Sequence, residues 1–387
     1  MEKILSIFTN LFGNFTNITW QMVLMWAIGA LLIYLAIKKE MEPTLLLPIG
    51  FGAILVNLPL SGAVTQYDET GNVLGEIGAI DRLYDMGIGN ELFPLLLFIG
   101  IGAMIDFGPL LSNPKMMLFG AAAQFGIFFT FGLARIIGFD FANAASAAII
   151  GAADGPTSIF VANELNASYS GAIIVAAYSY MALVPIIQPP VIKALTTKKE
   201  RAIKMPYNPT NVSKSVRIAF PIFVTLIAGL ISNQSVSLVG FLMFGNLIRE
   251  CGVLEGLSQT AQKELANLIT IVLGLAVSTT MQADKFVTVE TFLILALGLF
   301  AFIFDTAGGV LFGKFINLFT KNKINPMVGA AGISAFPMSS RVVHKMGLKE
   351  DPTNHLLMHA AAANVSGQIA SVIAGGLILK LVSPLIG

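Results

Sequence analysis

Long apolar stretches, separated by short polar loops, occupy most of this chain. A run of about 20 predominantly apolar residues is long enough to cross the hydrocarbon core of a membrane as a helix. The pattern predicts ten spans, at approximately residues 18–37, 44–60, 92–111, 116–136, 168–192, 213–232, 235–250, 265–282, 288–313 and 353–381. The expected fold is therefore an all-α polytopic membrane protein.

Two apolar segments do not fit a continuous helix. Residues 141–166 place Asp154 between glycines and a proline in the sequence GAADGPTSI, and residues 325–346 read NPMVGAAGISAFPMSSRVVHKM. Glycine and proline interrupt helices and leave backbone carbonyl and amide groups in need of other partners. We predict that both segments are broken or re-entrant helices.

The composition agrees with a membrane location. The chain is 55% hydrophobic and 12% charged, whereas roughly 25% charge is typical of soluble domains. Its net charge of +1 comes with basic residues grouped in a few loops, so no nucleic-acid partner is expected. The lone Cys251 excludes an internal disulfide, and no phosphate-binding GxxxxGK[ST] loop is present to make the chain an ATPase.

The charged loops predict the orientation of the chain. Residues 193–217 are rich in lysine and arginine with one acid, Glu200, and the positive-inside rule places such a loop in the cytoplasm. Residues 61–91 are acidic apart from Arg82 and are expected outside. Counting spans from these loops, residues 141–166 make no net crossing, and residues 325–346 enter and leave the membrane from the cytoplasmic side.

The count makes the two halves alike in order and opposite in orientation. Each half runs span, span, broken segment, span, and GAADGPTSI at 151–159 is echoed by GAAGISAFP at 329–337. Opposed repeats with discontinuous helices are typical of inverted-repeat transporters, although a shared Gly/Ala-rich composition also produces such similarity. The predicted organisation is an interfacial helix (1–17), accessory spans with an outside loop (18–90), a first repeat (91–192), a basic loop with connecting spans (193–264) and a second repeat (265–387).

Asp154 is the strongest candidate for a functional residue. A central aspartate costs roughly 2.5–3.5 kcal/mol in a membrane helix and usually faces a bundle interior or an ion path. A sodium ion prefers several oxygen ligands, which this carboxylate, freed backbone carbonyls and polar side chains of the opposed repeat would supply. The candidate ligands on that repeat include Asn325, Ser334 and Asn364, and the region lacks the thiolate or imidazole ligands of a transition-metal site.

Other polar residues allow two interpretations each. Arg341 suits pairing with Asp154 or with a bound carboxylate, because its planar guanidinium can form two hydrogen bonds to a carboxylate. The alternative is an arginine at a helix end whose side chain extends to water. Tyr180 is either a hydrogen-bond donor and proton source or a packing residue. Asp305 is a second intramembrane acid without a predicted partner. His355 and His359 are spaced to share a helical face, but without the glutamate of a zinc protease.

Four segments together carry a family resemblance: GAADGPTSIF, YSYMALVP, NPMVGAAGISAFPMSSRV and HAAAANVSG. In combination they closely resemble the membrane β subunit of biotin-dependent sodium-translocating decarboxylases, a family that includes the oxaloacetate, methylmalonyl-CoA, glutaconyl-CoA and malonate decarboxylase pumps. The resemblance covers most of the chain from about residue 90 onward.

The resemblance implies an activity and its partners. A carboxyltransferase moves a carboxyl group from the substrate to biotin on a carrier subunit, and the β subunit decarboxylates carboxybiotin. This reaction drives sodium from the cytoplasm to the outside and consumes an external proton. The family also suggests a small membrane-anchoring subunit, a homo-oligomer, and a place in the lipid of a prokaryotic plasma membrane. Which acyl substrate is used depends on the carboxyltransferase.

The resemblance also implies roles for particular residues. Asp154 matches the family's sodium-site and proton-switch aspartate, and Arg341 matches a position associated with carboxybiotin. The implied catalytic residues are Asp154, Tyr180 and Arg341, and the implied sodium ligands are Asp154, Asn325, Ser334 and Asn364. The alternative function is a secondary sodium/proton antiporter or a sodium-coupled carboxylate transporter, which would use the same repeats and the same aspartate. A membrane scaffold without transport would explain neither broken helix.

Overall fold

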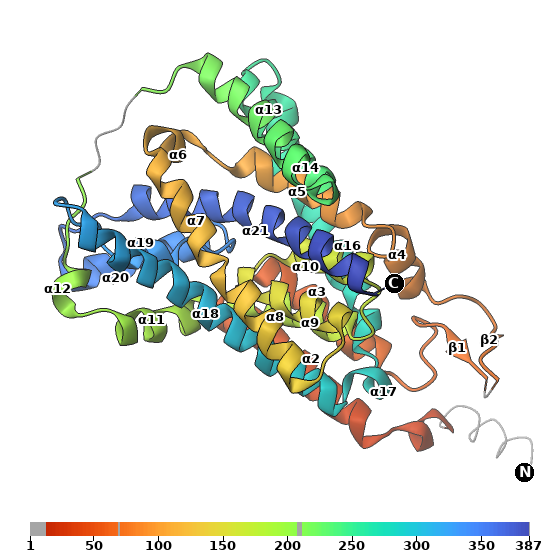
Figure 1. The fold of residues 1–387 in the computed structure, drawn as a ribbon. Coiled ribbons are helices and arrows are strands. Elements are labelled where there is room, and N and C mark those ends of the chain that lie inside the picture. The colour runs from red at the N-terminus through yellow and green to blue at the C-terminus, as the bar shows by residue number, and fades with distance from the viewer. Residues whose placement is uncertain (1–12, 69, 207–210, 387) are drawn as a thin grey trace, which may run out of the picture. The chain divides into compact units, whose positions relative to one another are not determined.

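The computed structural model describes residues 13–68, 70–206 and 211–386, and these residues are predominantly helical (Figure 1). The chain divides into two compact units. The first contains residues 1–93 and 267–292, and the second contains residues 94–266 and 293–387. The interfacial helix predicted over residues 1–17 lies mostly outside the described residues, which begin with a 3-10 turn, η1, at Gly13–Asn17.

The first unit is built on a close pair of helices, α2 (Trp20–Lys39) and α3 (Pro43–Val56). At their contact, a Cβ atom on Gly29 would lie 2.6 Å from the carbonyl oxygen of Gly50, so only glycine fits. Small residues of this kind let helix backbones approach closely within a membrane. The other elements are the antiparallel strands β1 (Gln66–Tyr67) and β2 (Val73–Leu74), and the helices α4 (Ala79–Gly87), α16 (Ala266–Val277), η6 (Ser278–Met281) and α17 (Ala283–Phe286).

Asn57 joins the two chain segments of this unit. Its Nδ2 donates hydrogen bonds to the carbonyls of Ala53 at 2.7 Å and Met281 at 2.8 Å, and its Oδ1 accepts one from Ala283 N at 2.7 Å. Asn57 is buried, and a buried amide whose groups are all paired fixes the geometry of its neighbours. The end of α3 is thereby tied to the turn between η6 and α17.

The second unit holds most of the remaining helices. In chain order they are α5 (Leu92–Met104), α6 (Gly108–Ser112), η2 (Pro114–Met116), α7 (Met117–Ala123), α8 (Phe125–Ile137), α9 (Phe141–Ile149), η3 (Ile150–Ala152), α10 (Gly155–Glu164), α11 (Ser170–Leu195), α12 (Lys198–Arg201), α13 (Lys214–Ile231), η4 (Asn233–Ser235), α14 (Val236–Cys251), α15 (Glu255–Thr260), the π-helical segment η5 (Ala261–Leu265), α18 (Val289–Phe319), α19 (Met327–Ala330), α20 (Met338–Glu350) and α21 (Leu357–Ile386).

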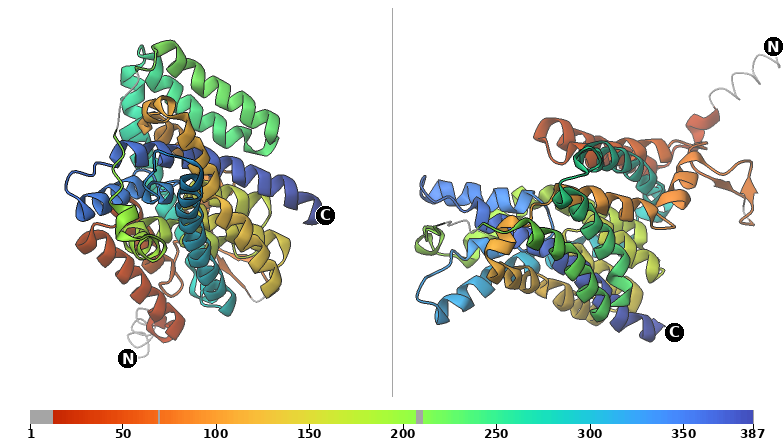
Figure 2. Two further views of the ribbon diagram at one scale, coloured as in Figure 1. Left: turned by 60° about the vertical axis from the view of Figure 1, so that its left-hand side comes forward. Right: turned by 90° about the horizontal axis from the view of Figure 1, so that it is seen from above.

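Helix α21 occupies the centre of the second unit. It packs against α6, α7, α9, α10, α14 and α20, and much of its length is buried (Figure 1). Helices α13 and α14 pack against each other as a hairpin joined by η4 (Figure 2). A helix that is buried on several sides is surrounded by protein rather than by lipid. Polar residues on α21 can therefore face other helices.

Among the described residues, seven helices are long and apolar enough to cross a membrane: Trp20–Lys39, Pro114–Ile137, Ser170–Leu195, Lys214–Ile231, Glu255–Met281, Val289–Phe319 and Leu357–Ile386. They coincide with seven of the ten predicted spans. The other three predicted spans are helical, but each helix alone is too short to count as a membrane span. Helix α3 has 14 residues, α14 has 16, and α5 reaches spanning length only together with α4. Proline or glycine just beyond their ends, as at Pro59 and Gly252, stops them.

Both predicted helix interruptions are present. Residues 141–166 form α9, η3 and α10 with a break at Ala153 and Asp154, and in residues 325–346 the chain is non-helical between α19 and α20. The all-α polytopic fold is confirmed. The sidedness of the loops, the inverted repeat and its domain boundaries stay predictions.

Candidate functional site

The first interruption places a carboxylate at the start of a helix. Ala153 has a left-handed backbone conformation (φ 53°) and Asp154 is extended. Asp154 is the N-cap of α10, and its Oδ1 accepts a hydrogen bond from Thr157 N at 3.2 Å. Aspartate is a favoured N-cap, and Pro156 suits the first turn because its missing N–H is not needed there. The residues that break one helix therefore begin the next.

The second interruption is in contact with the first. Ser334, between α19 and α20, donates from its backbone N to the carbonyl oxygen of Ala152 at 2.9 Å. Its Oγ donates to Oδ2 of Asp154 at 3.1 Å. Backbone groups freed by one break are thus satisfied by the other, which is how irregular backbone is tolerated inside a membrane protein. The predicted site residues Asp154 and Ser334 lie together.

The Asp154 carboxylate is buried among neutral groups. Its residue is 4% exposed, and Oδ2 accepts a second hydroxyl, from Ser371, at 2.7 Å. None of the ion pairs within the described part of the chain includes Asp154. A buried carboxylate without a basic partner is stabilised by a bound cation or by a proton. The site is therefore suited to exchange one for the other.

Helix α21 lines the second interruption with one polar face. Asn364 donates from Nδ2 to Ile333 O at 2.7 Å, and Gln368 donates from Nε2 to Ser334 O. Together with Ser371 these residues stand at positions i, i+4 and i+7, which fall on one side of a helix. Of the three, Asn364 was expected from the sequence, whereas Gln368 and Ser371 were missed. The sequence signal that relates them to Asn364 is their helical spacing.

Asp305 finds its partner in the backbone. It is fully buried in α18, and its Oδ1 accepts a hydrogen bond from the backbone N of Ile127 at 3.1 Å. The backbone N of Gly126 also donates to this carboxylate. These amides belong to the first turn of α8, so Asp305 caps that helix from another part of the chain. Its Oδ2 lies next to the first interruption, because a Cβ atom on Gly151 would be 2.6 Å from it.

The comparison with known proteins decides the family. The family model for the Na+-transporting oxaloacetate decarboxylase beta subunit matches residues 21–382. The chain belongs to this family of β subunits.

Curated relatives of this β subunit have several substrates in their names. The chain is 47% identical to the methylmalonyl-CoA decarboxylase subunit beta of Veillonella parvula, over 96% of both chains. It is 44% identical to the oxaloacetate decarboxylase beta chain of Haemophilus ducreyi, over 100% of both, and 47% identical to the glutaconyl-CoA decarboxylase subunit beta of Acidaminococcus fermentans, over 96% of both. The resemblance seen in the sequence is confirmed, and the β subunit is a multi-pass membrane component of a decarboxylase.

Asn325 of this β subunit makes its hydrogen bonds away from Asp154. Its Nδ2 donates to Arg201 O at 2.8 Å and Ile203 O at 2.9 Å, and its Oδ1 accepts from Met327 N at 3.1 Å. The amide therefore joins the loop after α12 to the start of α19. The structure does not bring Asn325 together with the other three predicted sodium ligands.

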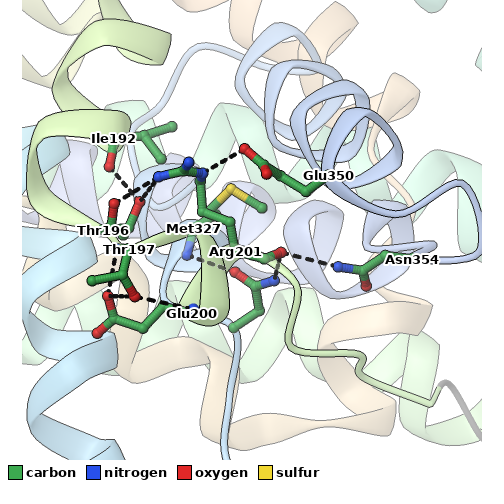
Figure 3. A network of polar contacts seen from close by, with 9 residues as sticks. Ile192, Thr196, Thr197, Glu200, Arg201, Met327, Glu350 and Asn354 are labelled. Atoms are coloured by element: carbon green, nitrogen blue, oxygen red, sulfur yellow. Dashed lines mark hydrogen bonds and ion pairs between the residues drawn. The ribbon is translucent and has the colours of Figure 1, made fainter.

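Arg201 is the centre of this second polar network (Figure 3). Its guanidinium pairs with Glu350 Oε1 at 2.7 Å and donates to Thr196 O at 2.6 Å. Its carbonyl oxygen accepts from Asn354 Nδ2 at 3.1 Å, in addition to Asn325. One buried residue thus connects the start of the second broken segment, at Asn325, to the end of α20, at Glu350.

Two further ion pairs flank Arg201. Lys314 pairs with Glu200 at 3.2 Å, and Lys204 pairs with Asp351 at 2.9 Å. Partial burial raises the pKa of Glu200, but hydrogen bonds from Thr197 and the charge of Lys314 outweigh it, so the pKa lies below its usual value. Hydrogen bonds from the Thr353 side chain and backbone, with Lys204, lower the pKa of Asp351 to about 2. Both carboxylates are ionised at neutral pH.

Arg341 lies in the first turn of α20 with an exposed side chain. None of the ion pairs among the described residues involves it. Of its two expected partners, Asp154 already has Thr157, Ser334 and Ser371 instead. The guanidinium is accessible to an external carboxylate.

Tyr180 and the histidines lie outside the Asp154 cluster. The Tyr180 hydroxyl donates to Leu295 O on α18 at 2.5 Å. His355 and His359 do not share a helical face, because α21 begins only at Leu357; that expectation is wrong. His355 packs near His344, and His359 Nε2 lies 3.2 Å from Met205 O. The described residues contain no cluster of three or more His, Cys, Asp or Glu able to hold a metal ion.

Proposed function

We propose that this β subunit decarboxylates carboxybiotin and couples the reaction to export of sodium, which binds at Asp154. The observation that carries the proposal is the buried Asp154 carboxylate at the junction of two helix interruptions. There it accepts hydrogen bonds from the Ser334 and Ser371 hydroxyls, and no basic side chain among the described residues pairs with it. Ion sites of inverted-repeat transporters are formed where discontinuous helices meet. The family membership supplies the chemistry that would drive the ion.

The chemistry of the cluster fits sodium. Its groups are a carboxylate, hydroxyls and carbonyls, which are oxygen ligands of the kind that hard cations prefer. The Oδ1 atom of Asn364 is buried and has no hydrogen-bond partner within the described part of the chain, so it is available as an acceptor. We assign Asp154, Ser334 and Asn364 to the ion. Asn325 is assigned to the start of the second broken segment, since its amide groups form their hydrogen bonds there.

Arg341 is the proposed contact for carboxybiotin. Its planar guanidinium donates two parallel hydrogen bonds to a carboxylate, and its exposure leaves room for one. The predicted orientation places this segment on the cytoplasmic side, where carboxybiotin on a carrier subunit would approach. Tyr180, the third residue implied as catalytic, has its hydroxyl on Leu295 O, which supports a role in joining α11 to α18.

Sodium and a proton would compete for Asp154 during turnover. Moving one charge against 100 mV costs about 2.3 kcal/mol, so export needs an energy source, and decarboxylation supplies it. Sodium stabilises the ionised carboxylate, and an external proton neutralises it after the ion leaves. Movement of either interruption would change the ligand set and open the site to the other side of the membrane.

The proposal includes the complex around this chain. A carboxyltransferase and a biotin carrier would deliver carboxybiotin, a small membrane subunit would anchor them, and the β subunit would form a homo-oligomer in a prokaryotic plasma membrane. The names of the relatives include three different substrates. This agrees with a substrate chosen by the carboxyltransferase.

The proposal is tested with the purified complex in sealed vesicles. CO2 release from carboxybiotin and uptake of radioactive sodium are measured together, with and without each reactant. We expect each process to require the other. Sodium movement at full rate without decarboxylation would contradict the pump and favour the sodium/proton antiporter.

A further inference from the structure

Asp305 is the second buried acid of this β subunit. Among the described residues, Asp154 and Asp305 are the only buried aspartate or glutamate side chains. The proposed function assigns Asp154 to sodium and leaves Asp305 without a role. Acids inside a membrane protein are costly and commonly mark ion or proton pathways. Asp305 is therefore a candidate for a second site on such a pathway.

The Asp305 carboxyl lies between the start of one helix and the end of another. On one side, Oδ1 accepts a hydrogen bond from Ile127 N at 3.1 Å, in the first turn of α8. On the other side, Oδ2 lies against Gly151 of η3, because a Cβ atom there would be only 2.6 Å away. The segment η3 ends the helical run that begins with α9. The two oxygens are therefore in opposite environments.

These environments favour a proton on Oδ2. The start of a helix presents free N–H groups, which suit the acceptor Oδ1, whereas the end of a helix presents carbonyl oxygens and the negative end of the dipole. Oδ2 is buried and has no hydrogen-bond partner within the described part of the chain. An ionised oxygen finds no donor there, but a protonated carboxyl can donate to a carbonyl oxygen. The arrangement thus suits a neutral carboxyl group.

The elements around Asp305 supply no positive charge to balance a carboxylate. The α9 helix and η3 contain no titratable residue, and the only one in α8 is Arg135, whose guanidinium donates to Phe139 O. On α18 itself, Glu290 and Lys314 are at least nine residues away. The close contact of Oδ2 with η3 also leaves no space for the several oxygen ligands that a sodium ion needs. A proton is the cation that fits.

Helix α18 contacts both broken segments close to Asp305. Gly151, against Oδ2, lies three residues before Asp154 in the first interruption. One turn after Asp305, Gly309 lies against Gly329 of α19, and a Cβ atom on either glycine would collide with the carbonyl group of the other. Movement of the first interruption relative to α18 would therefore uncover Oδ2.

We propose that Asp305 is a second proton-binding site of this β subunit, which carries a proton on Oδ2 while η3 packs against it and releases the proton when the first interruption moves. The inference rests on the proposed function, in which an external proton is taken up as sodium leaves Asp154. When water reaches Oδ2, the O–H bond breaks, the proton passes to water and the carboxylate keeps the electron pair. Repacking of η3 requires a proton to be taken back.

The resting state of Asp305 is tested by infrared spectroscopy, which distinguishes a protonated carboxyl from a carboxylate. Aspartate labelled with carbon-13 at the side-chain carboxyl identifies the residue type, and exposed aspartates are ionised at neutral pH. In Asp154→Asn, we expect one labelled band of a protonated aspartate, which disappears when Asp305→Asn is added. Absence of this band in Asp154→Asn would show that Asp305 is ionised and would overturn the inference. The measurement in Asp154→Asn does not depend on the folding of Asp305→Asn.

The release of the proton is tested with Asp305→Asn, which keeps an acceptor for Ile127 N but has no proton to give up. We expect sodium binding, measured by scintillation proximity, to be kept, and CO2 release coupled to sodium uptake to be lost. Asp140→Asn is the matched control, because Asp140 is an exposed helix cap that accepts from Asn143 N at 2.9 Å, and it should retain full turnover. Full coupled turnover in Asp305→Asn would mean that the residue only caps α8, and would overturn the inference.

Asp154→Asn in the same assays separates the inference from the proposed function. If Asp154→Asn abolishes sodium binding while Asp305→Asn has normal coupled turnover, the proposed sodium site stands and the role of Asp305 falls. If Asp154→Asn still binds sodium with wild-type affinity, the proposed sodium site itself falls, and the inference falls with it.

Discussion

Ser371 on α21 donates a 2.7 Å hydrogen bond to Oδ2 of Asp154, the same oxygen that accepts from Ser334 at 3.1 Å. Three separate segments of the chain therefore meet at one carboxylate: the first interruption, the second interruption and α21. A shift of any of the three removes a donor from Asp154. This dependence gives a physical basis for coupling the ion's affinity to a conformational change.

The first prediction concerns Asp154 itself. Asp154→Asn keeps the size of the side chain and its capacity to accept from Thr157 N, but removes the charge that balances a cation. We expect sodium uptake and sodium-dependent decarboxylation to be lost, while the complex still assembles. Uptake into vesicles and gel filtration of the purified complex measure the two properties. Transport at the wild-type rate in Asp154→Asn would exclude this residue from the ion path.

The second prediction compares two serines on α21. Ser371→Ala removes a donor to the Asp154 carboxylate and should raise the half-saturating sodium concentration roughly 10- to 100-fold, since hydrogen bonds to charged groups contribute about 1.5–3 kcal/mol. Ser366→Ala is the matched control, because its hydroxyl donates to Met117 O at 2.9 Å on another face of the helix. Equal effects of the two substitutions on sodium affinity would show that α21 acts through packing alone.

The sequence predicts the kind of chemistry at this site better than it predicts which residues belong to the site. Asp154 and Ser334 are recognisable because glycines and prolines mark the breaks in which they lie, and the structure joins them. Asn325 belongs to the same motif, yet its hydrogen bonds go to Arg201 and Ile203. A motif fixes residue types along the chain but not distances between segments. Contacts with the loop after α12 depend on tertiary packing, which no local pattern encodes.

The remaining differences have local causes. Ser371 and Gln368 follow Asn364 at helical spacing, but serine and glutamine also occur in packed membrane helices, so composition does not distinguish them. Apolar runs overestimate helix length, as in α5, which ends at Met104 before Asp106 and the Gly108–Pro109 pair.

The third prediction concerns the network that holds the second broken segment. Arg201 and Glu350 form an ion pair whose side chains are 8% and 20% exposed, and Arg201→Ala would leave the partner charge uncompensated. Loss of one partner of a buried pair costs about 3–5 kcal/mol, so thermal unfolding in detergent should occur several degrees lower. Lys204→Ala breaks a more exposed pair, with a lysine side chain 58% exposed, and should have little effect. A larger loss of stability in Lys204→Ala than in Arg201→Ala would contradict this role of Arg201.

The fourth prediction concerns orientation. In a variant without Cys251, Lys199→Cys in the basic loop should react with an impermeant thiol reagent only from the cytoplasmic side. Glu76→Cys, at a side chain that is 92% exposed, should react only from outside. Labelling is compared in intact cells and in inverted vesicles. Reaction of both cysteines from one side would refute the span count, and with it the opposed repeats.

The fifth prediction separates carboxybiotin chemistry from sodium binding. Arg341→Lys keeps the positive charge but loses the planar fork that binds a carboxylate at two points. Because Arg341 is exposed and is not among the hydrogen-bond partners of Asp154, we expect decarboxylation to fall at least tenfold while sodium affinity stays unchanged. Lys345→Ala is the matched control, as it removes another exposed cation one turn later on α20 and should leave both properties intact. Rates of CO2 release and direct sodium binding are measured on the same preparations. Loss of sodium affinity in Arg341→Lys would indicate that this guanidinium acts at the sodium ion instead of at carboxybiotin. The second interruption would then serve ion binding and not contact with carboxybiotin.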